Sequence, residues 1–461
     1  MHLHWHRSDL RIEDNATLEH GNHKTAGMFV LDPGILECSG PARTKFLLES
    51  LNELRERYTD AGSELAIFQG SSEELVPEVA LENEADVVTW GRDYTPLAKR
   101  RDRKVESTLE EMDLESQRYL DGYLHGPEEI YTNAGDPYQV YSYYYRKWKD
   151  RQKPEPVDTD PDFVELQPTS DAGKLLQEVP ELDDIGFDQP VSDPQMGGRD
   201  KGLELMHQFL DGEVYSYAEE RDVPAAEGTS RLSPHLHFGT LGARELWHAV
   251  QETEPRNERE IEGVEEFESQ LAWREFYNQV LHHHPYVITE NFKDVDVVWR
   301  NDPEEIEAWR RGETGYPFVD AGMRQLLETG FIHNRVRMVA ASFLTKDLLA
   351  DWRYGYRWFR KKLVDHDAAN DNGGWQWASS TGTDSQPYFR VFNPVTQGEK
   401  YDSDCRYIKR YVPALRGLDS DDVHGWSSIS TERRKELAPG YPEPIVDHAE
   451  RREIAIEKFG D

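Results

Sequence analysis

Short apolar runs alternate with amphipathic stretches over the first 130 residues of the chain. Four apolar runs have the length of buried strands, at 2–5, 27–31, 65–68 and 87–90. Three stretches repeat apolar side chains at helical spacing, at 43–58, 73–82 and 97–111. Strands that alternate with helices predict a doubly wound, mostly parallel sheet with helices on both faces. Because no G-x-G-x-x-G follows the first run, this α/β domain lacks the fingerprint of a dinucleotide-binding Rossmann unit.

Helical spacing dominates from Lys201 onward and predicts an all-α domain. The clearest helical segments are 201–211, 264–282, 319–329, 334–350 and 445–458. Residues 151–200 hold seven prolines and thirteen acids with few aromatic side chains, a composition that cannot form a core of its own. The sequence therefore predicts an α/β domain over 1–130, a long surface linker over 131–200 and a helical domain over 201–461.

The chain carries a formal net charge of −36, and its acidic side chains are spread along the whole length. A uniform excess of carboxylates gives a strongly solvated, self-repelling surface of the kind that halophilic proteins use, so we expect a salt-adapted source. The chain has no apolar run of 18 residues, and it begins without the apolar core of a secretory signal. Two cysteines, Cys38 and Cys405, are too few for a disulfide framework or an iron–sulfur cluster. We expect a cytoplasmic, monomeric protein without a membrane segment.

Residues 331–362 carry a net positive charge, unlike the chain as a whole. Between 331 and 362 there are eight basic residues against two acids, a local excess of +6. The basic residues are Arg335, Arg337, Lys346, Arg353, Arg357, Arg360, Lys361 and Lys362. Lys and Arg contact phosphates locally, so this stretch is either a nucleic-acid-binding face or an ordinary solvated helix face.

The densest group of candidate functional residues lies between Asp365 and Gln397, in DHDAANDNGGWQWASSTGTDSQPYFRVFNPVTQ. Asp365 and Asp367 are two apart, so they suit a loop or a helix start, where carboxylates accept hydrogen bonds. The glycine pair at 373–374 permits close approach to a flat partner. A buried helix with a polar start and two core tryptophans is the alternative explanation of this pattern.

This segment closely resembles the flavin-binding segment of the DNA photolyase/cryptochrome family, whose members read much like D-x-D-x-x-x-N-N-G-G-W-Q-W. The resemblance covers most of the chain, in separate blocks such as GTSRLS, ESQLAWREFY and GFIHNRVRM, and is strongest to class I cyclobutane pyrimidine dimer photolyases of halophilic archaea. It implies bound FAD and light-dependent repair of DNA containing pyrimidine dimers, by electron transfer to a flipped-out dimer. A cryptochrome-like blue-light receptor without repair activity is the alternative.

The family's flavin-contacting positions correspond to ten residues of this chain. They are Tyr217, Thr229, Ser230, Arg231, Leu232, Ser233, Asp365, His366, Asp367 and Asp371. Most photolyases have asparagine at the position that faces flavin N5, where this chain has Asp371. Aspartate there is typical of plant-type cryptochromes, in which it can protonate the flavin, so Asp371 is also a candidate catalytic residue.

Other family positions face DNA or relay electrons. The DNA-facing positions correspond to Arg221, Gln270, Trp273, Asn334, Arg335, Met338, Trp377 and Gln397. Many members have glutamate where this chain has Gln270, which cannot share a proton with a thymine carbonyl. The three positions of the electron-relay tryptophans are occupied by Trp375, Trp352 and Trp299. Core packing is the alternative role for each tryptophan taken alone.

In related enzymes the N-terminal domain binds a light-harvesting antenna pigment, and the resemblance makes Arg43 and Asp93 candidate contacts. The blocks ARTKFLLESLNELRERY and WGRDYTPLAKRRD look most like the branch that binds a deazaflavin, with methenyltetrahydrofolate as the alternative pigment. His237 stands where that branch often has a lysine.

Three histidines at the start of the chain form a separate group. His2, His4 and His6 share one strand face, which suits a metal ion. Since no further ligand cluster lies nearby in the sequence, we expect a structural role and no bound metal.

Overall fold

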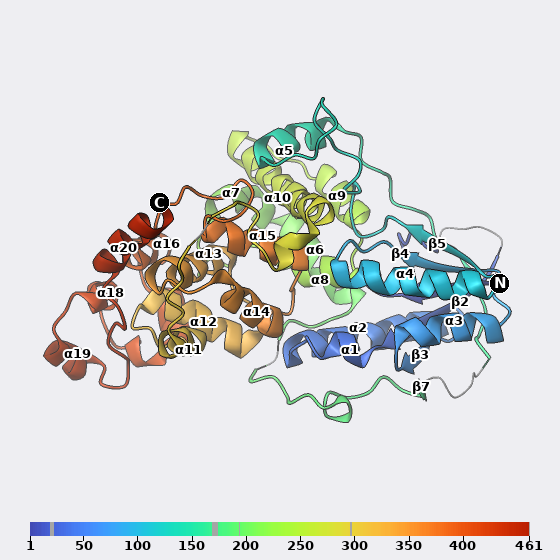
Figure 1. Ribbon diagram of the computed structural model, residues 1–461, viewed down its shortest axis with the longest axis horizontal. Coiled ribbons are helices and arrows are strands. Elements are labelled where there is room, and N and C mark those ends of the chain that lie inside the picture. Colours follow the sequence, from blue (N-terminus) through green and yellow to red (C-terminus); the bar gives the residue numbers. More distant parts are fainter. Residues whose placement is uncertain (19–22, 168–173, 193, 296, 461) are drawn as a thin grey trace.

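The computed structural model describes residues 1–18, 23–167, 174–192, 194–295 and 297–460, and Figure 1 shows two lobes side by side. The N-terminal lobe is built on a β-sheet, and the C-terminal lobe is made of helices. This confirms the fold class expected from the sequence. Among the described residues, no helix combines the length and the apolar character that a membrane span requires.

The sheet of the N-terminal lobe has seven strands. They are β1 (His2–His6), β2 (Lys24–Leu31), β3 (Ala66–Gln69), β4 (Val87–Gly91), β5 (Glu115–Tyr119), β6 (Asp162–Phe163) and β7 (Lys174–Leu176). Their order is β5-β4-β1-β2-β3-β7, with β6 also paired to β2. All pairings are parallel except that of β7 with β3. The strand order reverses between β1 and β4, and ligands bind open α/β sheets at such points.

Helices cover both faces of this sheet. On one face, α2 (Pro41–Asp60) packs through Phe46 and Leu51. On the other face, α3 (Ser72–Glu82) and α4 (Pro96–Glu111) pack through Val76 and Val105. A short helix, α1 (Pro33–Leu36), follows β2. Because β1 and β2 lie between two layers of helices, they are buried along nearly their whole length.

The segment predicted to be a surface linker takes part in the fold. After α5 (Tyr141–Asp150), β6 pairs with the start of β2 and β7 pairs with β3. The hydrophobic pattern did not predict β5, β6 or β7. β5 is a polar edge strand that is mostly exposed, and β6 and β7 are two and three residues long. Residues 168–173 and 193 of the predicted linker lie outside the described part of the chain.

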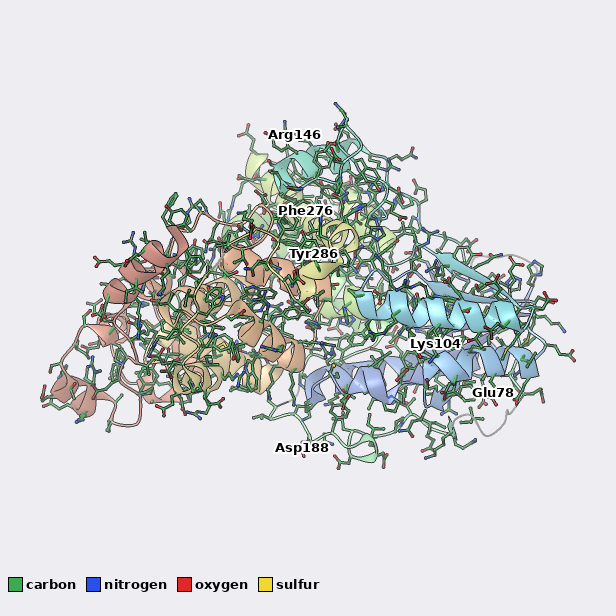
Figure 2. All side chains as sticks on the ribbon, in the orientation of Figure 1. Glu78, Lys104, Arg146, Asp188, Phe276 and Tyr286 are labelled. Carbon is green, nitrogen blue, oxygen red and sulfur yellow. The ribbon has the colours of Figure 1, made fainter. Side chains whose placement is uncertain are left out.

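The remaining helices belong mainly to the C-terminal lobe. The longer ones are α6 (Arg199–Asp211), α9 (Ala243–Gln251), α10 (Glu258–His283), α11 (Pro303–Arg311), α12 (Pro317–Thr329), α13 (Asn334–Ser342), α14 (Trp352–Lys362), α15 (Ala368–Ala378), α16 (Pro394–Tyr401) and α20 (His448–Gly460). The shorter ones are α7 (Tyr217–Glu220), α8 (Ser233–Phe238), α17 (Arg406–Tyr411), α18 (Ser420–His424) and α19 (Thr431–Leu437). Single 3₁₀ turns occur at Asp183–Ile185, Glu213–Ser216, Pro285–Ile288, Pro413–Leu415 and Gly425–Ser427. Figure 2 shows Phe276 inside this lobe, where it lies in a core cluster that includes residues of α5, α6 and α10.

One predicted helix is shorter and less regular than expected. In the segment 334–350, α13 ends at Ser342 and continues directly into a π-helical turn, η4 (Phe343–Asp347), whereas residues 348–350 lie outside the helix. Leu349 then has a φ of 51°, in the left-handed region that an L-residue cannot repeat along a helix. The chain therefore changes direction before α14 begins at Trp352.

A buried ionic network joins the two lobes. Arg244 of α9 pairs with Asp14 and Asp121 of the N-terminal lobe, and Arg11 pairs with the same Asp121, all at 2.7–2.8 Å. The four side chains are at most 5% exposed. Removing one partner would leave an uncompensated buried charge, at a cost of about 3–5 kcal/mol. This network therefore fixes the lobes against each other.

Candidate flavin and DNA-binding site

Three consecutive polar residues, Asp365, His366 and Asp367, connect α14 to α15 inside the helical lobe. Asp367 caps α15, because its carboxylate accepts a hydrogen bond from the backbone N–H of Asn370 at 2.8 Å. Burial would raise the pKa of Asp367, but Arg274 and other neighbours hold the pKa below its ordinary value. Asp367 is therefore ionised although it lies inside the protein.

Asp365 is anchored by residues from two other helices. One guanidinium nitrogen of Arg337 on α13 lies 2.9 and 2.8 Å from the two carboxylate oxygens, and the Ser233 hydroxyl on α8 donates to the carboxylate at 2.7 Å. Burial would raise the pKa of Asp365, but Arg337 and Ser233 hold the pKa below its ordinary value. The ion pair ties α13 and α8 to the segment before α15.

Asp371 lies buried on the first turn of α15. Its Oδ2 is 2.5 Å from His366 Nδ1, and its Oδ1 is 3.6 Å from an Arg337 nitrogen. Burial raises the pKa of Asp371 to about 8. Burial and the Arg43 cation hold the pKa of His366 well below its ordinary value. At neutral pH the pair therefore consists of a protonated carboxyl and a neutral imidazole that share a hydrogen bond.

The loop at 228–233 has the backbone of an anion-binding nest. Arg231 has a φ of 56°, in the left-handed region, whereas Leu232 directly after it has right-handed backbone angles. Successive residues of opposite hand turn their N–H groups toward one concave side. Here the Leu232 N–H donates to the Ser230 hydroxyl at 3.4 Å. Thr229 and Ser230 supply hydroxyl groups to the same loop. Tyr217, predicted at the same site, is buried in a core cluster of the helical lobe.

Trp273 of α10 has one face covered by another aromatic ring. Tyr141 of α5 stacks on it, with ring centroids 3.6 Å apart and planes inclined by 9°. The Tyr141 hydroxyl donates to the Ser269 carbonyl at 2.7 Å, and its backbone N–H donates to Asp384 at 3.0 Å. Tyr141 is thus fixed in place against one face of Trp273, and the rings of Phe276 and Tyr277 lie 5.6 and 5.4 Å from the Trp273 ring.

Two further predicted DNA contacts form a polar group, with Arg221 at the end of α7 and Gln270 one turn before Trp273 on α10. Arg221 pairs with Glu266 and also donates to Gln270 Oε1 at 3.2 Å. The Gln270 amide nitrogen donates in turn to Glu266 at 2.9 Å. Arg221 and Gln270 therefore both have protein partners. The Gln270 amide is oriented by Arg221 and Glu266.

Arg335 is also paired with an acid. Its guanidinium donates to the two carboxylate oxygens of Asp222 at 2.6 and 3.2 Å, and it lies over the Tyr401 ring at 4.5 Å from the centroid. Asn334 is exposed at the start of α13, with its amide nitrogen 3.8 Å from the sulfur of Met338 one turn later. Asn334 and Met338 therefore share one face of α13. A phosphate that binds Arg335 must compete with Asp222.

The last two predicted DNA-facing residues come from different helices. Trp377 of α15 is partly buried, with its ring centroid 6.3 Å from that of Phe392. Gln397 of α16 has a buried Oε1 without a hydrogen-bond partner among the described residues. A buried polar atom left unpaired costs free energy. Gln397 Oε1 is therefore placed to accept a hydrogen bond from a bound partner or a water molecule.

The three predicted relay tryptophans belong to one part of the helical lobe. Trp375 lies against Gly355 of α14, where an added Cβ would be 2.0 Å from the indole ring. Gly355 is one turn from Trp352, which is fully buried. The backbone next to Trp299 hydrogen-bonds to Leu349, just before α14, and Trp299 itself is partly exposed. Trp375 and Trp352 are thus buried and Trp299 is partly exposed, and their role as a relay stays a prediction.

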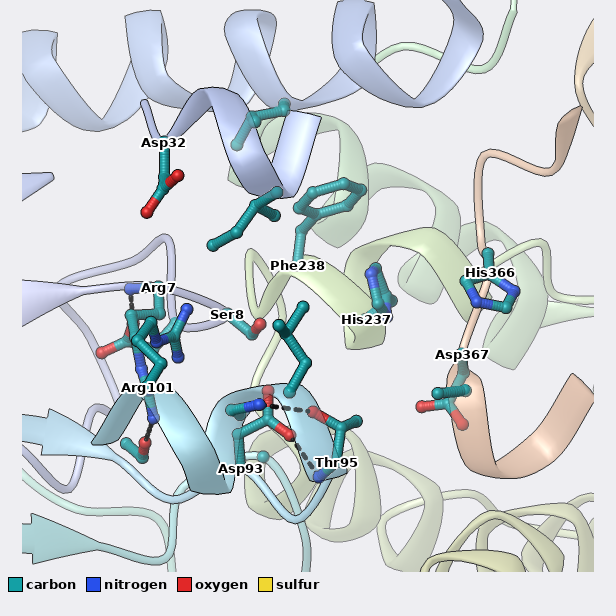
Figure 3. Close-up of a pocket in the computed structure, with 18 of the residues that line it drawn as sticks. Arg7, Ser8, Asp32, Asp93, Thr95, Arg101, His237, Phe238, His366 and Asp367 are labelled. Carbon is teal, nitrogen blue, oxygen red and sulfur yellow. Dashed lines mark hydrogen bonds between the residues drawn. The ribbon is translucent and has the colours of Figure 1, made fainter. Parts of the chain in front are cut away.

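A cavity of about 400 Å³ lies between the lobes, at the carboxyl ends of β1 and β4 (Figure 3). Arg43 and Asp93, the predicted antenna contacts, both line it. His237, His366 and Asp367 line its end in the helical lobe. Burial lowers the pKa of His237 to about 4, so this side chain is uncharged at neutral pH. The cavity therefore lacks the cation that a lysine would supply at that position.

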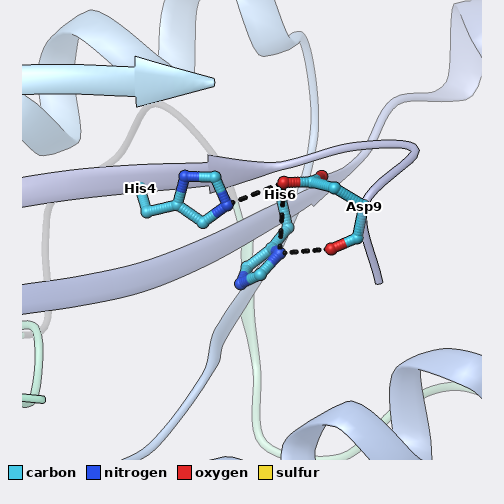
Figure 4. A group of neighbouring side chains, drawn as sticks. All are labelled: His4, His6 and Asp9. Carbon is cyan, nitrogen blue, oxygen red and sulfur yellow. Dashed lines mark hydrogen bonds and ion pairs between the residues drawn. The ribbon is translucent and has the colours of Figure 1, made fainter. Parts of the chain in front are cut away.

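Two of the three histidines of β1, His4 and His6, form a hydrogen-bonded group with Asp9 (Figure 4). His2 is not part of this group and stacks on His23, with ring centroids 4.5 Å apart. Ligand atoms of His4, His6 and Asp9 lie within 4.8 Å of one another, as a metal site would require. His4 bonds to Asp9 Oδ2 at 2.9 Å, and its other nitrogen lies 3.3 Å from the Thr89 hydroxyl. His6 Nδ1 faces the Asp9 carbonyl at 3.0 Å, so it carries the proton, and Nε2 lies 2.7 Å from the Tyr58 hydroxyl. These bonds account for every ring nitrogen of His4 and His6, which favours a structural role for these two residues.

Comparison with known proteins agrees with this architecture. Residues 2–162 match the family model described as DNA photolyase, and residues 267–461 match the one described as FAD binding domain of DNA photolyase. A deoxyribodipyrimidine photo-lyase of Halobacterium salinarum is 47% identical, covering 100% of this chain and 98% of its own length.

Solved structures agree as well. A bacterial class III photolyase from Agrobacterium tumefaciens is 34% identical with a TM-score of 0.88, covering 100% of this chain and 97% of its own. An archaeal photolyase from Sulfolobus tokodaii with two FAD molecules is 32% identical with a TM-score of 0.85, covering 100% and 99%. The fold and the site define a two-lobed flavin-binding protein of the photolyase and cryptochrome type. This chain belongs to the DNA photolyase family.

Sequence reasoning missed three residues that the structure brings to the site. They are Asp222, the partner of Arg335; Glu266, the partner of Arg221; and Tyr141, which stacks on Trp273. Arg337 was named only as part of the basic stretch, and its pairing with Asp365 was not predicted. A buried carboxylate requires a charge partner, so the sequence could have predicted a cation beside Asp365. Which of the nearby arginines supplies it depends on the orientation of α13, which the sequence does not specify.

Proposed function

We propose that this protein repairs cyclobutane pyrimidine dimers in DNA by a light-dependent reaction, as a deoxyribodipyrimidine photo-lyase. The observation that carries the proposal is its 47% identity to the Halobacterium enzyme over the whole chain. We also propose that it works as a cytoplasmic monomer, divided into an α/β domain at 1–130, a linker at 131–200 and a helical FAD- and DNA-binding domain at 201–461.

The residues around α15 fit FAD. The nest at Arg231 and Leu232, with the nearby hydroxyl groups, suits a diphosphate. The charged Asp365–Arg337 pair suits the polar edge of a flavin ring. Bound FAD would supply the chemistry, because in its reduced form and excited by light it donates the electron that opens the dimer. The chain would bind and orient the cofactor, and it would hold a proton on Asp371.

The lesion would be bound next to Trp273. A dimer flipped out of the duplex would stack on the face of Trp273 opposite Tyr141. Met338 and Trp377 would contact the apolar parts of the lesion, and Gln397 Oε1 would accept a hydrogen bond that the protein itself does not satisfy. DNA phosphates would compete with the acids that now pair with the neighbouring arginines.

An antenna pigment would occupy the cavity between the lobes. Arg43 and Asp93 line this cavity, and its position at the switch point of the sheet is one that ligands favour. A deazaflavin is favoured by the sequence blocks around these residues, with methenyltetrahydrofolate as the alternative. The neutral His237 weakens the case for an anionic pigment, and the Sulfolobus relative with two FAD molecules adds a flavin as a further candidate. Extraction of the purified protein and mass spectrometry would identify the pigment.

The decisive test is repair of an oligonucleotide that contains one cyclobutane dimer. The protein is reduced chemically, mixed with the oligonucleotide in molar KCl and illuminated with blue light, and the restored thymines are counted by chromatography against a dark control. We expect repair only in the light. Asp371 favours the alternative, a blue-light receptor, and light-driven reduction of FAD without any repair would support that alternative.

A further inference from the structure

His366 lies between the buried Asp371 carboxyl and the cavity between the lobes. Its Nδ1 is 2.5 Å from Asp371 Oδ2, and the same imidazole lines the cavity between the lobes (Figure 3). Asp371 itself is not among the residues that line the cavity. The other group beside the Asp371 carboxyl, Arg337, is bound to Asp365 on its far side. His366 also occupies a position that the family pattern D-x-D leaves open.

We propose that His366 is a proton-relay residue that carries protons from the cavity between the lobes to Asp371. The inference rests on the proposed function, because it requires a flavin beside Asp371 that accepts a proton after it has been reduced. It adds to that function a route by which a proton reaches Asp371 from the cavity. His366 acts through Asp371 and is therefore a positioning residue for this transfer.

The transfer needs protons only. The O–H bond of Asp371 breaks as its proton leaves for the reduced flavin. The proton on His366 Nδ1 then moves to Asp371 Oδ2. A water molecule in the cavity gives a proton to His366 Nε2 and leaves as hydroxide, which the buffer neutralises. One proton enters the pair and one leaves it, so the pair ends with the charge it had at the start. The electron that reduces the flavin arrives separately, by the photoreduction already expected of this family.

The surrounding charges favour a relay that holds one shared proton. The charged groups facing Asp371 are Arg337 from α13, Arg43 from α2, and Asp365 and Asp367 from the segment before α15. Those facing His366 include Arg43, Arg360 from α14, Asp365 and Asp367, with the Tyr356 ring 5.7 Å away. The cations Arg43 and Arg360 disfavour a charged imidazole. A neutral imidazole beside a neutral carboxyl can accept and donate at the same time, as a relay requires.

The test uses the full-length protein with bound FAD in molar KCl, freed of any antenna pigment so that water and imidazole can enter the cavity. Protons taken up after a reducing flash are timed with a pH-indicator dye in the wild type and in His366→Asn, His366→Gln, Tyr356→Phe and Asp371→Asn. We expect both His366 variants to take up protons about 100-fold more slowly, the lower end of what general acid–base assistance provides. Imidazole added to the buffer should enter the cavity and restore the rate in the His366 variants but not in Asp371→Asn. Tyr356→Phe keeps the ring beside His366 and should behave as the wild type.

A second readout does not depend on the cofactor. The infrared C=O band that is lost in Asp371→Asn should shift in flavin-free His366→Asn, because the carboxyl loses its hydrogen bond to the imidazole. Wild-type rates in the His366 variants would overturn the proposal. Slow uptake that imidazole does not restore, with an unshifted band, would also overturn it, since that is the result of a purely structural role.

The proposed function is measured separately on the same samples, by dimer repair with chemically reduced protein. Wild-type protein that takes up protons through His366 but does not repair dimers would contradict the repair function and support the relay. Protein that repairs dimers while the His366 variants take up protons at the wild-type rate would contradict the relay alone.

Discussion

Replacing Asp222 with asparagine should tighten the binding of dimer-containing DNA. In the free protein Asp222 occupies the guanidinium of Arg335 with two hydrogen bonds, at 2.6 and 3.2 Å. A DNA phosphate can reach Arg335 only by displacing this carboxylate. Asp222→Asn removes the competing charge and keeps the shape of the side chain, whereas Arg335→Ala removes the cation itself. The two variants should therefore change DNA affinity in opposite directions.

The structure sets the size of both effects. The side chains of Arg335 and Asp222 are 15% and 32% exposed, so their pair is worth roughly 0.2–1 kcal/mol, and losing it should tighten DNA binding by about 1.5- to 5-fold. One additional unpaired cation steepens the slope of log K against log salt by about 0.9. Between 0.5 and 2 M KCl the advantage of Asp222→Asn should therefore shrink about 3.5-fold, since a fourfold change in salt raised to the power 0.9 gives that ratio.

Fluorescence anisotropy of a labelled, dimer-containing duplex over this salt range would measure both quantities. Glu73→Gln is the matched control, because it removes an equal charge from an ion pair with Lys104 of α4, which Figure 2 labels in the N-terminal lobe. The control should leave the slope unchanged. If Asp222→Asn binds DNA more weakly than the wild type at 0.5 M KCl, or if its affinity has the same salt slope as that of the wild type, Arg335 does not contact a phosphate and the reasoning fails.

Three further predictions follow from the interior of the helical lobe. Trp375→Phe should slow the light-driven reduction of oxidised FAD, followed by flavin absorbance, but leave dimer repair by chemically reduced protein intact; unchanged photoreduction would exclude the relay. Trp273→Ala should lower the preference for dimer-containing over intact DNA by about 1–3 kcal/mol, through lost stacking, and an unchanged ratio of the two affinities would contradict this. Burial raises the pKa of Asp371 from 3.8 to about 8, so between these values the folded protein keeps a proton that the unfolded chain has lost. The stability of the flavin-free wild type relative to Asp371→Asn should therefore fall by about 1.4 kcal/mol per pH unit across that window, as measured by urea unfolding, and a flat difference would disprove the assignment.

Helices and strands could be predicted from the sequence where the apolar periodicity was strong. The central strands β1 to β4 and the helices α2 to α4 bury one or both faces, so their patterns reflect burial. β5, β6 and β7 were missed because a short or exposed edge strand is specified by its neighbours in the sheet and not by its own side chains. The break at Leu349 was missed for a related reason, since apolar spacing continues through the turn while the backbone does not.

The membership in the photolyase family is confirmed, and the relative from Halobacterium fits the salt adaptation inferred from the net charge. The roles of single residues remain predictions, but the structure sharpens several of them. The sequence identified Asp371 as unusual and could not reveal its contact with His366, because a spacing of five residues across a helix start does not specify a side-chain distance. It likewise identified Arg335 without Asp222, which lies 113 residues away.

Asp222 and Glu266, the acids that the sequence did not point to, bear on how a chain with a net charge of −36 would bind DNA through arginines. Arg221 and Arg335 are each paired with a carboxylate, so the proposed lesion face carries little free positive charge until phosphates displace Glu266 and Asp222. In molar salt, counterion release contributes little to affinity, because log K falls steadily with log salt. Recognition under those conditions must depend on contacts that salt does not screen. Stacking on Trp273 and a hydrogen bond to the unpaired Gln397 oxygen are contacts of that kind, so we expect lesion preference to survive salt concentrations that abolish binding to intact DNA.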